Sequence, residues 1–408
     1  MFDIAVVGGG IVGLASAYKI QLKNPDLKIV VFEKEEVLAT HQTGHNSGVI
    51  HSGLYYKPGS YKAKNCVSGR RELVKFAQEH KIAHDVCGKV VVAGNDSELP
   101  FLDKIYNTGQ QNEIEGIQYI NSNEIKEIEP YCEGVKGILV PCTGIIDFVG
   151  VTKKLAELIT GINPESQILT GCEVQSMSEG EPKTLVTSKG NFQAKKTIFC
   201  AGLQSDRMAV KDGVDPGMQI VGFRGDYYEL SDQGKHKVKN LIYPVPNPAF
   251  PFLGVHFTRM YNGEIECGPN AVFVFKREGY GKTDFNLKDT VQALTYSGTW
   301  KLFAREWRFG LDEYKRAFSK KLFLKRLQVL VPSLTMEDLK PGRAGVRAMA
   351  LDPKGDMIDD FKIEYKNNSI HVLNAPSPAA TSALAIGEEV SELAQKYFIE
   401  GIKSDIPG

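Results

Sequence analysis

The chain has 408 residues, of which 42% are apolar and 24% charged, and its formal net charge is zero. This length favours two cooperating globular domains. A neutral chain lacks the basic excess that neutralises nucleic-acid phosphates, so no nucleic-acid partner is expected. Seven dispersed cysteines without a C-x-x-C pair indicate reduced thiols and a cytoplasmic location, rather than disulfides or a zinc cluster. No apolar stretch is long enough to span a membrane.

The N-terminus has the pattern of a dinucleotide-binding unit. Phe2–Val7 is a short, apolar, β-branched run that predicts a buried parallel strand, and Leu14–Leu22 predicts a helix. In the glycine-rich turn between them, Gly8 permits the tight bend and Gly10 lets the backbone approach a pyrophosphate. Gly13 lets the helix pack closely on the strand. The free N–H groups at the helix start favour phosphate binding.

A second predicted strand, Lys28–Phe32, ends at Glu33, 20 residues beyond Gly13. A carboxylate at this place accepts hydrogen bonds from the ribose of an adenosine, and it disfavours the 2′-phosphate of NADP. The motif alone does not separate FAD from NAD. Its position at the very start of the chain favours FAD.

The segment from His41 to Tyr56, HQTGHNSGVIHSGLYY, resembles the flavin-contacting stretch of L-2-hydroxyglutarate dehydrogenases and oxidases. These enzymes belong to the FAD-dependent superfamily of D-amino-acid oxidase and glycerol-3-phosphate dehydrogenase. The resemblance covers essentially the whole chain. It recurs at Pro58–Ser60, Phe223–Tyr227, Pro251–Arg259, Gly268–Ala271, Lys276–Tyr280, Gly345–Ala348 and Asn374–Ser382.

The resemblance implies an α/β fold with a discontinuous, Rossmann-like FAD-binding domain and a largely antiparallel α+β substrate domain. The FAD domain is expected at residues 1–85, 141–210 and 340–408, and the substrate domain at 86–140 and 211–339. Further helices or strands are predicted at Phe148–Ile162, Glu173–Val174, Lys196–Cys200, Phe223–Leu230 and Phe252–Phe257.

FAD is the expected cofactor, and no metal is expected. His41, His45 and His51 cluster in the sequence, but no carboxylate accompanies them at ligand spacing. Ser382–Ala394 should form a helix, capped by Ser377 or Thr381, whose positive end stabilises the reduced flavin. The expected cofactor-binding residues are Gly8, Gly10, Gly13, Glu33, Lys34, Thr43, Asn46, Ser47, Gly48, Val174, Ala201, Gly202, Ser377, Ala379, Ala380 and Thr381.

Oxidation of a 2-hydroxy dicarboxylate requires a cation for the carboxylate beside the reacting carbon, a base, and a second cation for the distal carboxylate. Arg347 is the candidate for the first cation, because its Gly-Val-Arg setting resembles the superfamily's substrate-anchoring arginine. Arg259 and Lys276 are candidates for the second cation. An imidazole suits the role of the base at neutral pH, and the contenders are His51 and His256.

Residues Thr299–Leu330 predict an amphipathic helical segment with a strongly basic face. One interpretation is a peripheral contact with the inner face of a membrane, where a dehydrogenase passes electrons to a quinone. The other is a helix pair packed on its own domain with a solvated basic face.

The favoured function is the oxidation of L-2-hydroxyglutarate, a small dicarboxylate 2-hydroxy acid, to 2-oxoglutarate. Hydride transfer to flavin N5 is followed by electron transfer to a quinone-linked acceptor or to oxygen. The alternatives are a D-amino-acid or glycine-type amine oxidase on the same fold and a non-catalytic FAD-binding subunit. A glycerol-3-phosphate dehydrogenase fits the sequence blocks poorly.

Overall fold

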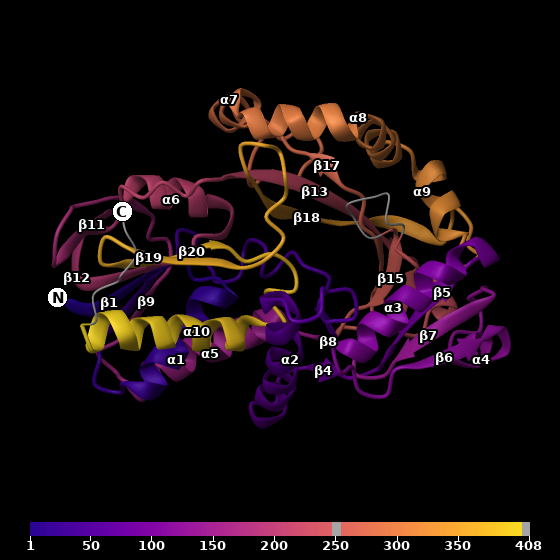
Figure 1. Cartoon of the computed structure of the whole chain (residues 1–408), viewed down its shortest axis with the longest axis horizontal. Helices are drawn as coiled ribbons and strands as arrows, with labels where there is room; N and C mark the ends of the chain where they lie inside the picture. The colour runs from indigo at the N-terminus through magenta and orange to yellow at the C-terminus, as the bar shows by residue number, and fades with distance from the viewer. Residues whose placement is uncertain (247–253, 402–408) are drawn as a thin grey trace.

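The computed structural model describes residues 1–246 and 254–401. Two large sheets divide these residues into a nucleotide-binding half and a second half, drawn at the left and right of Figure 1. The expected combination of a Rossmann-like domain with a second, largely antiparallel domain is confirmed. No helix of the described residues is both long enough and apolar enough to cross a membrane.

The first sheet is built on five parallel strands in the order β9-β2-β1-β12-β20, to which β10, β11 and β19 add antiparallel pairs. Its strands β1, β2 and the end of β12 are buried on both faces, as expected for a parallel sheet. The strand bounds are β1 Phe2–Val7, β2 Ile29–Phe32, β9 Gln167–Leu169, β10 Val174–Met177, β11 Lys183–Thr187, β12 Gly190–Phe199, β19 Lys362–Lys366 and β20 Ser369–Asn374.

Helices α1, α5 and α10 lie along one face of this sheet, and α6 lies on the other side (Figure 1). The apolar residues of α1, α5 and α10 form a core with β1, β2 and β20 that includes Ile4, Leu14, Leu155 and Ile386. The helix bounds are α1 Ile11–Lys23, α5 Phe148–Ile162, α6 Ser205–Lys211 and α10 Ala383–Ala394.

The second sheet has the order β17-β13-β16-β15-β14-β5-β7-β6, with β18 paired along nearly all of β13. All of its pairs are antiparallel except β14 with β5. The strands are β5 Lys89–Ala93, β6 Gln118–Asn121, β7 Lys136–Val140, β13 Gln219–Leu230, β14 Leu241–Pro244, β15 His256–Arg259, β16 Ile265–Gly268, β17 Val272–Phe273 and β18 Leu339–Leu351.

Most of the remaining helices flank this sheet, whereas α2 packs against α10 and the core of the first half. A small three-stranded sheet joins the two halves. The helices are α2 Tyr61–Glu79, α3 Leu99–Gln111, α4 Ser122–Ile128, α7 Leu287–Thr295, α8 Ser297–Ala317 and α9 Lys320–Leu327. The small sheet consists of β3 Val49–Ile50, β4 His84–Asp85 and β8 Gly144–Ile146.

Two expectations differ from the structure. Residues 340–351 were assigned to the FAD domain, but β18 lies in the second sheet because its backbone pairs with β13 from Gln219 to Leu230. The strand expected at Phe252–Phe257 begins later, at His256, and the part of this prediction before Gly254 lies outside the described residues.

The packing of α10 against α1 yields a stability prediction. A Cβ atom at Gly387 of α10 would lie 2.7 Å from the carbonyl carbon and oxygen of Ala15 in α1. Gly387→Ala should therefore lower the free energy of unfolding by about 1–3 kcal/mol, measured as an earlier midpoint in urea. Gly310→Ala in α8 is the matched control, because nothing lies within 4 Å of the added methyl group. A midpoint that rises equally in both variants would contradict the tight helix contact.

Candidate functional site

A cavity of about 1570 Å³ lies where the two halves meet. Its wall includes the turn after β1, the segment from Ala39 to Tyr56, parts of β13 and β18, and the segment before α10. Typical small-molecule sites measure roughly 300–1000 Å³. The cavity therefore has room for a long cofactor together with a small substrate.

The glycines of the first turn have different surroundings, which match the roles expected for them. A Cβ atom at Gly8 would lie 2.2 Å from the carbonyl oxygen of Cys200, and one at Gly13 would lie 2.0 Å from the carbonyl oxygen of Gly8. These two glycines allow β1, β12 and α1 to approach closely. A Cβ atom at Gly10 would meet only the Thr43 hydroxyl, at 3.4 Å, so its backbone faces the cavity. The turn thus presents backbone to a phosphate without obstruction.

The end of β2 places Glu33 in the cavity wall beside this turn. The Glu33 carboxylate accepts hydrogen bonds from the Gly9 N–H and the Glu35 N–H, both at 3.0 Å. Thr43 reaches the same place from the other side, because its hydroxyl oxygen accepts a hydrogen bond from the Ile11 N–H at 3.1 Å. Glu33 and Thr43 therefore fix the turn and the start of α1 from two neighbouring segments.

Strand β18 is joined to the segment 41–48, which we call the flavin loop. Arg343 donates hydrogen bonds from its guanidinium to the carbonyl oxygens of Gly44 and Asn46, each at 2.6 Å. Its Nε also pairs with the buried Glu266 carboxylate at 2.5 Å. The His45 Nδ1–H donates to the Ala344 carbonyl at 2.7 Å. Arg343 therefore ties the flavin loop to the second sheet.

Two further contacts strengthen this junction. The Gln42 side-chain oxygen accepts a hydrogen bond from the Ala348 N–H at 3.1 Å. A Cβ atom at Gly345 would lie only 2.4 Å from the His45 carbonyl oxygen, so the strand and the loop are in backbone contact there. The loop is held along its length by one strand.

The N-terminal end of α10 also borders the cavity, through Pro376 to Thr381. The expected cap is wrong: Ser382 occupies the N-cap position and makes no side-chain capping bond. Thr381 is engaged elsewhere, because its hydroxyl accepts from the His51 N–H at 3.1 Å and donates to the Val49 carbonyl at 3.2 Å. Uncapped N–H groups at a helix start favour negative charge in the adjoining space.

His51 and His256 line the same cavity. Burial, together with the charges of Lys89, His256 and Lys62, lowers the pKa of His51 to about 3. Burial likewise lowers the pKa of His256 to about 4, assisted by the charges of Arg347 and Lys89. Both imidazoles are therefore neutral at pH 7. His256 donates from Nδ1 to the Gly254 carbonyl at 2.9 Å, which leaves Nε2 as its acceptor.

The three cation candidates lie in different places. Arg347 lines the cavity on β18, and its charge acts on both His256 and Tyr227. Lys276 lies exposed at the rim, on the loop whose Glu278 pairs with Lys34 after β2. Arg259 is outside the cavity wall, where it pairs with Asp85 and donates to Asn240. Arg224, in the sequence block Phe223–Tyr227, pairs with Asp226 in the core.

The other expected cofactor residues also line the cavity, with one exception. Gly48 is not in its wall; it adopts a φ of 65° and donates its N–H to the Asn46 side-chain oxygen at 2.8 Å. The residues that line it are Lys34, Asn46, Ser47, Val174, Ala201, Gly202, Ser377, Ala379 and Ala380.

Sequence reasoning missed Lys89, which is 2% exposed at the start of β5. Burial lowers the pKa of its ammonium group to about 8. The ammonium lies over the rings of Tyr55 and Tyr243, both of which line the cavity. A lone lysine before a run of valines gives no signal of this kind, because such residues usually face solvent. Arg343 was missed for the same reason.

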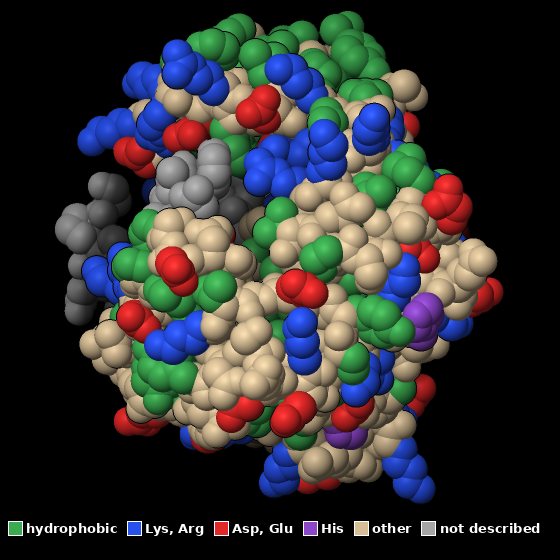
Figure 2. Space-filling model, turned by 90° about the vertical axis from the view of Figure 1, so that its right-hand side faces the viewer, with side chains coloured by type: hydrophobic (Ala, Val, Ile, Leu, Met, Phe, Trp, Pro, Cys, Tyr) green, Lys and Arg blue, Asp and Glu red, His purple; other side chains and the backbone are tan. Residues whose placement is uncertain are grey.

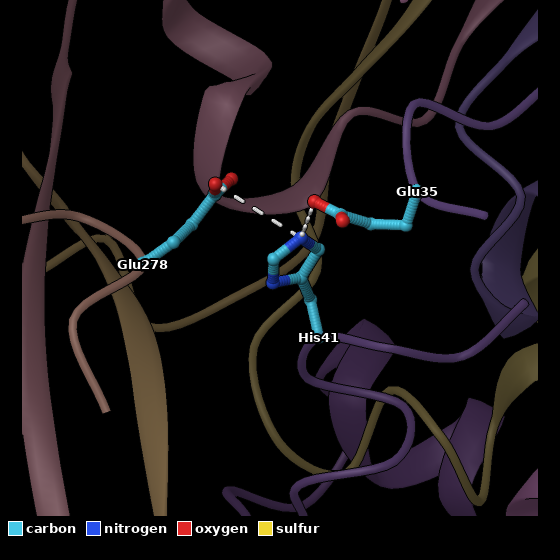
Figure 3. A group of neighbouring side chains, drawn as sticks. All are labelled: Glu35, His41 and Glu278. Carbon is cyan, nitrogen blue, oxygen red and sulfur yellow. Dashed lines mark hydrogen bonds and ion pairs between the residues drawn. The ribbon is translucent and has the colours of Figure 1, made fainter. Parts of the chain in front are cut away.

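Glu35, His41 and Glu278 form a cluster beside the cavity (Figure 3). The Nε2 atom of His41 lies 2.9 Å from Glu35 and 3.9 Å from Glu278, and its Nδ1 lies 3.1 Å from the Tyr280 hydroxyl. Glu35 precedes His41 by six residues, but Glu278 comes from a distant part of the chain, so spacing around His41 did not reveal the cluster. The Lys34 ammonium already pairs with Glu278, so the cluster resembles an ion-pair network that links β2, the flavin loop and the second half.

The chain matches the family model described as FAD dependent oxidoreductase over residues 3–393. The chain belongs to this family. It is 48% identical over 401 residues to the L-2-hydroxyglutarate dehydrogenase of Indibacter alkaliphilus, covering 97% of this chain and 100% of that protein. It is 42% identical to the enzyme of the same name from Escherichia coli K12, covering 96% and 92%.

Among solved structures, the chain resembles the FAD-bound L-alpha-glycerophosphate oxidase of Mycoplasma pneumoniae. The TM-score is 0.77 at 24% identity, with 100% of this chain and 97% of that chain covered, which supports the fold. FAD is therefore the cofactor of this family member, and the cavity fits it. The open backbone at Gly10, the carboxylate of Glu33 and the helix start at Pro376–Thr381 suit a phosphate, a ribose and a flavin ring.

The junction between β18 and the flavin loop predicts the effect of removing Arg343. Hydrogen bonds from a charged group contribute about 1.5–3 kcal/mol each, and the loop they fix lines the cofactor cavity. Arg343→Gln should therefore weaken FAD binding by roughly tenfold or more, measured by titrating FAD into the apoprotein.

The exposed Arg305, which pairs with Asp356 at 3.0 Å, supplies the control Arg305→Gln. The double variant Arg343→Gln/Glu266→Gln removes the carboxylate left unpaired by the single change. It should regain thermal stability without regaining FAD affinity. Wild-type FAD affinity in Arg343→Gln would show that the loop holds its shape without this arginine.

Proposed function

We propose that the protein oxidises L-2-hydroxyglutarate to 2-oxoglutarate. The observation that carries the proposal is that a guanidinium, Arg347, and two neutral imidazoles, His51 and His256, share one cavity with the nucleotide-binding turn. The named relatives support the choice of substrate. These groups are what the dehydrogenation of a 2-hydroxy acid requires.

Arg347 binds the carboxylate next to the reacting carbon. Paired N–H donors of a guanidinium match both carboxylate oxygens, so they fix the orientation of C2 as well as its position. The half-buried position of Arg347 strengthens this pairing relative to bulk water. When bound, FAD would supply the acceptor for the C2 hydrogen and its electron pair.

One of the two imidazoles takes the hydroxyl proton, so that the C–O bond becomes a carbonyl as the hydride leaves. Both are neutral in the free protein and can therefore accept a proton at pH 7. The Nε2 atom of His256 is its only acceptor, since Nδ1–H is held by Gly254. The backbone of His51 is fixed by Thr381 at the start of α10. The negative charge of the substrate stabilises the imidazole once it is protonated. Loss of the hydride from C2 makes the hydroxyl proton easier to remove.

As the final electron acceptor we propose a quinone at the inner face of a membrane, with oxygen as the alternative. The supporting feature is the outer surface of α7–α9, which we call the α8 surface. Trp300, Trp307, Leu311 and Phe318 are each more than half exposed there. Figure 2 shows hydrophobic side chains gathered along the top of the molecule, with Lys and Arg side chains close by.

This arrangement suits the headgroup region of an anionic membrane, where aromatic rings insert and basic residues contact phosphates. Helix α8 departs from helical geometry at Glu306, between the two tryptophans. The rest of the cytoplasmic protein would then face water. The membrane contact accounts for large apolar side chains that are each more than half exposed.

The catalytic assignment predicts which variants lose the chemical step. Wild-type holoenzyme mixed anaerobically with L-2-hydroxyglutarate should lose its flavin absorbance near 450 nm. His51→Gln and His256→Gln should both retain FAD, and the one that removes the base should reduce flavin roughly 10²–10⁴-fold more slowly. Stopped-flow absorbance measures the rate.

Arg347→Lys tests the carboxylate anchor in the same assay, and its apparent substrate affinity should fall because paired donors are lost. Bleaching by an amino acid but not by the hydroxy acid would favour the amine oxidase. No bleaching by either would favour a non-catalytic FAD-binding subunit.

The α8 surface predicts binding to lipid. The holoenzyme should sediment with vesicles that contain phosphatidylglycerol and not with pure phosphatidylcholine vesicles. Arg308→Gln, Lys321→Gln and Lys325→Gln together should weaken this binding by about 1 kcal/mol for each residue. Lys64→Gln, Lys75→Gln and Lys104→Gln, three exposed lysines elsewhere, form the control triple variant. Equal binding by both triple variants would rule out the α8 surface as the contact.

A further inference from the structure

Lys89 is a buried cation for which the mechanism above has no use. It is 2% exposed, and its ammonium forms no ion pair and no hydrogen bond with the described residues. An unpaired charge removed from water is costly, and proteins usually pair it. A lysine kept in such a place therefore needs a partner that arrives with a ligand.

The ammonium lies directly behind the wall of the cavity. It is 4.7 Å from the ring centre of Tyr55 and 4.8 Å from that of Tyr243. Both tyrosines line the cavity, and the Tyr243 ring packs against the His256 ring with centres 4.1 Å apart. Contact with two aromatic faces offsets part of the desolvation cost and leaves the positive charge unneutralised.

Two cations thus approach the histidines from different strands. Lys89 at the start of β5 acts on both His51 and His256, whereas Arg347 on β18 acts on His256. Two other basic groups near the histidines already have carboxylate partners. Lys62 pairs with Asp359 at 2.7 Å, and Arg343 pairs with Glu266.

We propose that Lys89 is a specificity-determining residue, which selects a substrate with a second carboxylate at the end remote from the reacting carbon. The inference rests on the proposed function and deepens it. Arg347 holds the carboxylate beside C2, the histidines lie at the reacting carbon, and the charge of Lys89 attracts the distal carboxylate across the wall formed by Tyr55 and Tyr243. Neither Arg259 nor Lys276 is then needed to bind the distal carboxylate.

The size of the effect follows from Coulomb's law. Opposite charges about 6–8 Å apart at an effective dielectric constant near 20 favour the dicarboxylate by roughly ten- to one-hundred-fold over a neutral end of equal length. A lysine in direct contact with the distal carboxylate would give a larger preference for the dicarboxylate. A lysine with only a structural role would give no preference.

The experiment compares ligands that differ only in the distal charge. Glutarate and pentanoate are titrated into FAD-loaded Lys89→Met, and binding is read from the perturbed flavin absorbance. KM is measured for L-2-hydroxyglutarate and for the L-isomer of 2-hydroxypentanoate. In Lys89→Met the preference for glutarate should fall at least tenfold, and pentanoate binding should be unchanged. The ratio of the two KM values should change in parallel, and kcat for the monocarboxylate should be retained.

Two variants complete the test. Lys89→Arg keeps the charge and should keep the preference. Arg259→Gln removes a paired cation outside the cavity and should also leave it intact. If Lys89→Met does not retain FAD, Lys89→Gln takes its place. A loss of the preference for glutarate in folded Lys89→Arg overturns the proposal.

Equal weakening of both ligands in Lys89→Met, or no change in either, also overturns it, because that is the result expected of a structural lysine. The binding titration needs no turnover. If Lys89→Met loses the wild type's preference for glutarate but neither hydroxy acid reduces the wild type, the proposed reaction is wrong while the role of Lys89 in selecting a dicarboxylate stands.

Discussion

The contact between β18 and the flavin loop is the constraint on which the rest of the site depends. Gly345 lies against the backbone of His45, and Arg343 reaches past it to hold the carbonyl groups of Gly44 and Asn46. A side chain at Gly345 would push the two segments apart. Because the loop also anchors the first turn of α1 through Thr43, this one junction sets the distance between the nucleotide-binding turn and the substrate-domain sheet.

Charge is distributed unevenly through the cavity. Near the start of α1 the donors are backbone N–H groups, which suit phosphates, and Glu33 supplies a single acceptor beside them. At the other end, Arg347 and Lys89 surround two imidazoles that burial keeps neutral. This end of the site therefore attracts an anion and holds its two imidazoles close to two positive groups. Such an arrangement favours a small acid over a neutral alcohol or an amine.

The sequence was sufficient for the parts of the fold that local patterns determine. Phe2–Val7 and Phe148–Ile162 have the predicted bounds, because each combines a clear apolar period with glycine or a capping residue at its end. Arg347 could be placed in the cavity from its motif. Lys89 and the pairing of Arg259 with Asp85 could not be predicted, because the partners are separated by long stretches of chain and a single basic residue carries no sign of its burial.

The junction at β18 has a consequence for how the protein is made. His45 and Ala344, which are in contact there, are 299 positions apart in the sequence. The first strand–turn–helix unit emerges from the ribosome early, yet β18, which forms part of the cavity wall, is absent until more than four-fifths of the polypeptide has been synthesised. The flavin loop is therefore without its β18 partner during most of translation. Cofactor capture then belongs to the final stage of folding, and a truncated product would be unable to retain FAD.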